Sequence, residues 1–100
     1  MADIVFHAEA SADIESIQVF SVARFGLAIA NEYLDGLEAS VLRLCEHPQM
    51  GREENGIVPP VRSLTYRSHK VYYRFDGETV FVVRVLHHAM NAAAHLRGET

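Results

Sequence analysis

The stretch HKVYYRFDGETVFVVRVLH, residues 69–87, decides the fold class of this chain. At its centre, Asp76-Gly77 is the strongest short signal for a β-hairpin turn. The residues on both sides are rich in valine, tyrosine and phenylalanine, which favour extended structure. The sequence therefore predicts two antiparallel strands, His69–Phe75 and Thr79–His87.

A two-residue turn would fix the register of this hairpin, with Tyr73 opposite Val80, Val71 opposite Val82 and His69 opposite Arg84. The face on which the helices are expected to pack would then carry Val71, Tyr73, Phe75, Val80, Val82 and Leu86. The other face would carry Tyr72, Phe81, Val83 and Val85, mixed with Lys70, Arg74 and His87. This second face is more apolar than a solvated sheet face should be. We expect a cover on it: residues 89–96, a sister subunit or a partner chain.

Upstream of the hairpin, residues 61–66 read as a third strand, and residues 47–60 read as a loop because they hold three prolines and two glycines. Residues 8–24 and 27–46 show helical periodicity, with Gly26 between them, and residues 3–7 read as a strand. The predicted fold is α+β, a helical hairpin packed on an antiparallel sheet in the order β-α-α-β-β-β. The predicted helical stripes are Ala10, Ile14, Ile17 and Phe20, and Ala30, Tyr33, Leu34, Leu37, Val41, Leu44 and Cys45.

Length and composition favour one domain over residues 1–100, with 49% hydrophobic residues to build a core. The single cysteine excludes an internal disulfide, and the first residues lack the pattern of a signal peptide. Uninterrupted apolar runs are far shorter than the roughly 20 residues that a membrane span needs. We therefore expect a cytoplasmic protein without a membrane segment.

Charge is unevenly distributed along the chain. Residues 1–55 hold ten acids and three bases, whereas residues 56–100 hold three acids and six bases. Eight of the nine bases are arginine, which suits bidentate contact with carboxylates or phosphates.

Known cofactor and metal motifs are missing from the sequence. There is no Gly-rich phosphate loop, no Cys-x-x-Cys and no His-Glu-x-x-His. Neighbouring residues on a strand point to opposite faces, so His87 and His88 are not expected to share a metal. The sequence predicts neither a cofactor nor a metal, and Cys45 is expected to be a buried apolar residue.

One set of basic side chains on the predicted sheet leaves two interpretations open. These side chains could hold an RNA phosphate and move protons without a metal, or they could be ordinary solvated edges and structural ion pairs. The set comprises Arg62, Arg67, His69, Lys70, Arg74, Arg84, His87 and His88.

The order of elements and several motifs resemble the ParE branch of the ParE/RelE toxin superfamily, over nearly the whole chain. The motifs are Ala10-x-x-Asp13-Ile14-x-x-Ile17, Phe25-Gly26, Ala30-x-x-Tyr33-Leu34, His47-Pro48-x-Met50-Gly51, Val61-Arg62-Ser63, Ser68-His69-Lys70-Val71-Tyr72-Tyr73-Arg74, Val83-Arg84-Val85-Leu86-His87-His88-x-Met90-Asn91 and His95-Leu96.

The resemblance implies one of two functions in a bacterial toxin-antitoxin system. ParE-like toxins act on DNA gyrase and need no catalytic residue of their own. RelE-like and YoeB-like relatives cut messenger RNA on the ribosome, and the residues that would serve here are Lys70, Arg84, His87 and His88. A protein that docks into ribosomal RNA is expected to be strongly basic, whereas this chain has a pI near 5.8. We therefore predict a gyrase inhibitor, with ribosome-dependent cleavage as the alternative.

The resemblance also implies a ParD-like antitoxin as partner, and no sequence-specific contact with nucleic acid. We predict that the antitoxin binds the second sheet face, at Tyr72, Arg74, Phe81, Val83 and Val85. We predict that the target binds the last strand and the tail, at Arg84, His88, Met90, Asn91 and Arg97.

Overall fold

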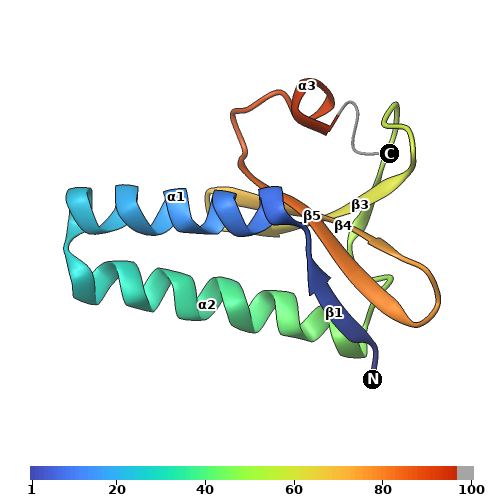
Figure 1. Ribbon diagram of the computed structural model, residues 1–100, viewed down its shortest axis with the longest axis horizontal. Helices are drawn as coiled ribbons and strands as arrows, with labels where there is room; N and C mark the ends of the chain where they lie inside the picture. The colour runs from blue at the N-terminus through green and yellow to red at the C-terminus, as the bar shows by residue number, and fades with distance from the viewer. Residues whose placement is uncertain (97–100) are drawn as a thin grey trace.

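The computed structural model of the chain describes residues 1–96 and shows a helical hairpin packed on a sheet (Figure 1). The predicted α+β architecture is confirmed. The elements are β1 (Asp3–Phe6), α1 (Ala8–Phe25), α2 (Leu27–Glu46), β2 (Arg52–Glu54), β3 (Val61–Tyr66), β4 (His69–Phe75), β5 (Thr79–His87) and α3 (Ala92–Leu96).

The two long helices are antiparallel and meet at Gly26, whose φ of 89° lies in the region that glycine adopts most readily. The apolar stripe of α2 packs inward as predicted. On α1 the prediction is wrong at Phe20, which is 63% exposed, while Ser21 takes the buried position. The reason is visible in Figure 1: the end of the hairpin reaches beyond the sheet, so the last turns of α1 have no strand beneath them.

The sheet has five strands in the order β1-β5-β4-β3-β2. It is mixed, because β1 lies parallel to β5 while the remaining neighbours are antiparallel. The predicted loop over residues 47–60 contains the short strand β2. Tyr73 on β4 ties this segment to the sheet: its hydroxyl donates to the Pro48 carbonyl at 2.8 Å and accepts from the Gly51 N–H at 2.9 Å.

The register of the β4–β5 hairpin differs from the prediction in two ways. Four residues, 76–79, lie between Phe75 and its partner Val80, and Tyr73 pairs with Val82. The Asp76 carboxylate closes the turn by accepting from the backbone N–H groups of Glu78 and Thr79. A bulge next to Tyr72 and Tyr73 then shifts the register again, and Val71 pairs with Val85.

Because of that bulge, the last residues of β5 exchange faces relative to the prediction. Val85 lies in the core under the helices, whereas Leu86 lies on the opposite face. The second face is covered by the tail, one of the three expected covers: Leu96 of α3 is 1% exposed. It packs with Val61, Tyr72, Val83 and Leu86.

Candidate functional site

Arg84, predicted to bind the target and, in the alternative, to serve catalysis, lies in an ion-pair network. Its Nε and Nη2 donate to the two carboxylate oxygens of Asp13 at 2.8 and 3.0 Å. Its Nη1 donates to Glu9 and to the His95 carbonyl, both at 3.2 Å. The Asp13 carboxylate also accepts from the Val85 N–H at 2.9 Å. Arg84 therefore links α1, β5 and the tail, and its side chain is only 13% exposed.

Lys70, the second cation of the alternative catalytic set, faces a different carboxylate. Its Nζ lies 3.9 Å from an oxygen of Glu54, on the β2 side of the sheet. Glu54 also accepts a hydrogen bond from Ser63. The structure therefore places Lys70 and Arg84 in separate ion pairs.

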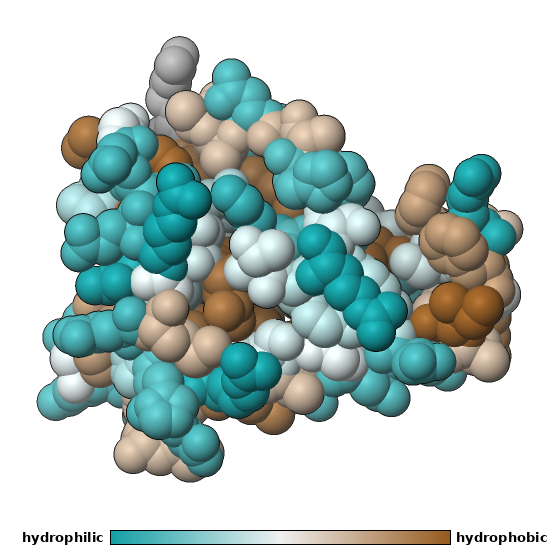
Figure 2. All heavy atoms as spheres, turned by 180° about the vertical axis from the view of Figure 1, so that it is seen from behind, coloured by the Kyte–Doolittle hydropathy of each residue, from teal (hydrophilic) through white to brown (hydrophobic). Residues whose placement is uncertain are grey.

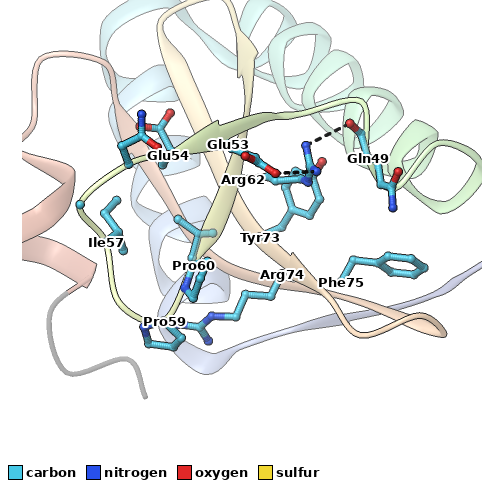
Figure 3. A pocket seen from close by; sticks show the side chains of 13 residues that line it. Gln49, Glu53, Glu54, Ile57, Pro59, Pro60, Arg62, Tyr73, Arg74 and Phe75 are labelled. Atoms are coloured by element: carbon cyan, nitrogen blue, oxygen red, sulfur yellow. Dashed lines mark hydrogen bonds and ion pairs between the residues drawn. The ribbon is translucent and has the colours of Figure 1, made fainter.

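A pocket of about 700 Å³ lies between β2, β3 and β4, and Glu54, the partner of Lys70, is part of its lining (Figure 3). Arg62 on its wall donates to the carbonyl oxygens of Gln49 and Gly51 and to Glu53. Arg74 and Pro59 also line this pocket. The contacts of Arg62 are made within the chain and stabilise the β2 edge.

Three histidines gather where β4 begins and β5 ends. The rings of His69 and His87 are 5.5 Å apart, and those of His87 and His88 are 4.4 Å apart. The expectation that His87 and His88 point to opposite faces is wrong, because β5 ends at His87 and the chain turns there. His87 Nδ1 accepts from the Ala89 N–H at 3.1 Å, and His69 Nδ1 lies 2.7 Å from the Tyr33 hydroxyl. Within residues 1–96, no cluster of three or more His, Cys, Asp or Glu side chains has a geometry fit for a metal ion.

Burial changes the electrostatics of His69. Loss of solvent lowers the pKa of His69, and repulsion from His87 and then His88 lowers it further. His69 is therefore neutral near pH 7, and its tautomer sets which partner donates in the hydrogen bond between Nδ1 and the Tyr33 hydroxyl.

Three residues of the predicted antitoxin site are not at the surface. Tyr72 and Val83 lie beneath the tail, and Val85 lies in the core under the helices because of the bulge. Arg74 and Phe81, which pair across β4 and β5, remain partly exposed. In this structure the predicted antitoxin site is therefore at least partly open to solvent at two of its five residues.

The predicted target-facing residues at the end of β5 are exposed. Met90 is 42% exposed, and His88 lies at the surface beside it. Asn91 is exposed too, although its side chain accepts from the Ala94 N–H at the start of α3. Arg97 lies outside the described residues.

A groove beside the helical hairpin was not predicted. It has a volume of about 460 Å³ and lies between the overhanging end of the hairpin and the β3–β4 turn. Around it, the hairpin exposes several large apolar side chains, seen as brown spheres on the right of Figure 2. They are Val19, Phe20, Phe25, Leu27 and Ile29. The one signal in the sequence was their high density around Gly26.

No helix within residues 1–96 combines the length and the hydropathy that crossing a bilayer requires.

Fold and site together define a small α+β protein with a hairpin-on-sheet core and an apolar groove at its helical end. A family model described as the ParE toxin of the type II toxin-antitoxin system parDE matches residues 4–92. Toxin ParE1 of Caulobacter vibrioides is 39% identical over 87 residues, covering 87% of this chain and 90% of that protein. Toxin ParE1 of Mycobacterium tuberculosis is 38% identical over 88 residues, covering 87% and 90%.

A solved structure has the same fold. It is titled "Chromosomal ParDE TA system from P. aeruginosa" and superposes with a TM-score of 0.76 at 22% identity. The match covers 87% of this chain and 96% of that one. The chain belongs to the ParE toxin family of type II toxin-antitoxin systems.

Proposed function

We propose that this ParE-family toxin inhibits DNA gyrase in the bacterial cytoplasm and is neutralised by a ParD-like antitoxin. The toxin would bind gyrase and block its cycle. The cleavage and religation of DNA remain the chemistry of gyrase, so the toxin needs no catalytic residue.

The observation that most favours gyrase inhibition over cleavage of messenger RNA is that Lys70 and Arg84 lie in separate ion pairs. Metal-free cleavage of RNA needs a cation that can reach the developing charge on the phosphate and a general acid or base beside it. Arg84 is held by Asp13 and Glu9, and Lys70 faces Glu54. Both cations are thus engaged by carboxylates of the chain itself.

Net charge supports the same proposal. A protein that binds ribosomal RNA gains most of its affinity by neutralising phosphates. This chain has a formal net charge of −4, which suits a protein surface better.

The antitoxin assignment rests on the family and on the exposed part of the second face. With the tail in place, Arg74 and Phe81 are the members of the predicted site that an antitoxin can reach. A segment that orders as it binds could cover these residues and continue over adjacent surfaces.

The three close imidazoles are the observation that favours the second candidate, ribosome-dependent cleavage. Expression of His87→Ala and His88→Ala variants in bacterial cells separates the two. A general acid or base contributes on the order of 100-fold or more to a rate. We expect both variants to stop growth as the wild type does, with cellular messenger RNA intact. Because His88 is also a predicted target contact, the result that would favour the nuclease is cleavage of messenger RNA by the wild type that a folded His88→Ala protein no longer performs.

A further inference from the structure

The groove at the helical end of the molecule has a fixed wall. Tyr33 on α2 contacts Tyr66 and His69 edge to face, with ring centroids 5.1 and 5.7 Å apart. The hydroxyl of Tyr33 lies 2.7 Å from His69 Nδ1. These contacts hold α2 against the β3–β4 turn and keep the groove open beside them.

The floor of the groove is apolar and solvent-exposed. Phe20 and Phe25 come from α1 and Ile29 comes from α2. These side chains are 63%, 54% and 55% exposed. Exposed apolar groups that gather in a hollow are typical of surfaces that bind another molecule.

The rim of the groove is basic, in a chain that is acidic overall. The chain has thirteen acids and nine bases, yet none of the described residues lining the groove is Asp or Glu. Arg67, in the β3–β4 turn, lies over the rings of Tyr33 and Tyr66, at 5.9 and 5.6 Å from their centroids. His69, which is neutral near pH 7, and His87 complete this side, so Arg67 is the cation of the described rim.

We infer that this groove docks a segment of a partner protein in which an aromatic or aliphatic side chain stands next to a carboxylate. The apolar side chain packs on Phe25 and Ile29, and the carboxylate pairs with Arg67. The inference concerns the chemistry of the surface and holds whether or not the toxin acts on gyrase.

A second copy of this chain is a poorer occupant. In a two-fold contact between two hairpin ends each groove would face the groove of the other copy, and neither described lining holds an Asp or Glu that could pair with Arg67. Like charges that face one another across an interface oppose association.

Three synthetic peptides added to the full chain test the inference, with binding followed by two-dimensional NMR of backbone amides. The first, acetyl-Glu-Leu-Phe-Glu-amide, has both the carboxylates and the apolar side chains. The second, acetyl-Gln-Leu-Phe-Gln-amide, lacks the carboxylates. The third, acetyl-Glu-Ser-Ser-Glu-amide, lacks the apolar side chains. A charged hydrogen bond is worth about tenfold in affinity, so we expect the first to bind about tenfold more tightly than either control. Its shifts should centre on Phe25, Ile29 and Arg67.

Two variants and two matched controls locate the contact. Ile29→Ser and Arg67→Asn should each weaken the first peptide about tenfold; asparagine suits the positive φ of 50° at position 67. Leu42→Ser and Arg52→Gln change exposed residues outside the groove and should stay within about twofold of the wild type. Equal melting midpoints would show that all four variants fold.

Three results would overturn the inference. The first is equal binding of the charged and neutral peptides, which would make the groove a non-selective apolar patch. The second is the absence of shifts at the groove with every peptide. The third is a groove whose signals change with protein concentration alone, which would make a second copy its occupant.

Discussion

Asp13 joins α1 to β5 through one carboxylate. It accepts two hydrogen bonds from Arg84 and one from the backbone of Val85, at the position where β1 no longer covers the edge of β5. Its side chain is 15% exposed, so loss of the carboxylate leaves a nearly buried guanidinium without its main partner.

We predict that Asp13→Ala lowers the free energy of unfolding by about 2–3 kcal/mol. This loss is small for the removal of one partner of a buried ion pair, because water reaches part of the Asp13–Arg84 pair. Glu9→Ala is the matched control: it removes a second carboxylate that contacts Arg84, and because Glu9 is 61% exposed its loss should cost about 0–1 kcal/mol. Urea denaturation measures both. Equal losses in the two variants would show that the Asp13 contact is not the stronger one.

His69 makes stability depend on pH. Because burial lowers the pKa of His69 in the folded chain, the unfolded chain binds more protons once the pH falls below about 6.5. The contribution of His69 to stability is therefore present above that pH and is lost as the pH falls. We predict that acidification from pH 7.5 to 5.5 destabilises the wild type more than His69→Gln in urea denaturation. Identical losses in the two proteins would contradict the assignment.

At the level of elements, side-chain periodicity was sufficient to predict both long helices and the three longer antiparallel strands. The register of the hairpin was not predictable in this way. Asp76-Gly77 suggested a two-residue turn, whereas residues 76–79 lie between the paired Phe75 and Val80, and a bulge lies opposite Tyr72 and Tyr73. The Asp-Gly pair marks where the chain turns, but it fixes neither the number of residues between the first paired ones nor a bulge further along the strand.

The groove could not be predicted for a related reason. Whether Phe20 is buried depends on how far the hairpin extends past the sheet, and that is a relation between elements distant in sequence. Tyr33 and His69, which shape the groove, are 36 residues apart. The basic residues were recognised in the sequence, but their pairing with Asp13 and Glu54 appears only in the folded chain.

The tail is a structural element as well as a predicted target surface. Leu96 is 1% exposed and closes the second core, so deletion of residues 91–100 would damage the fold rather than test target binding alone. We predict that Leu96→Ala costs about 2–4 kcal/mol in urea denaturation, as expected for a buried leucine. Met90→Ala, at a 42% exposed position, should stay within about 0.5 kcal/mol of the wild type. A loss at Leu96 no larger than at Met90 would show that the tail does not hold the sheet.

At the scale of the whole molecule, the exposed apolar side chains at the hairpin end indicate a protein that is stabilised by a partner. We predict that a ParD-like antitoxin at about 100 times its dissociation constant raises the free energy of unfolding by roughly 2.7 kcal/mol, through mass action alone. Thermal melts with and without the antitoxin measure this. A monodisperse free toxin whose melting midpoint does not move on addition of antitoxin would contradict the prediction.

The central claim is that gyrase is the target of this ParE-family toxin. The most direct measurement is DNA supercoiling by purified gyrase as the toxin is titrated, with the antitoxin added back in a parallel series. We predict that supercoiling falls as toxin increases and returns as the antitoxin is added. Unchanged supercoiling at every toxin concentration, together with cleavage of messenger RNA on ribosomes by the same preparation, would contradict the account.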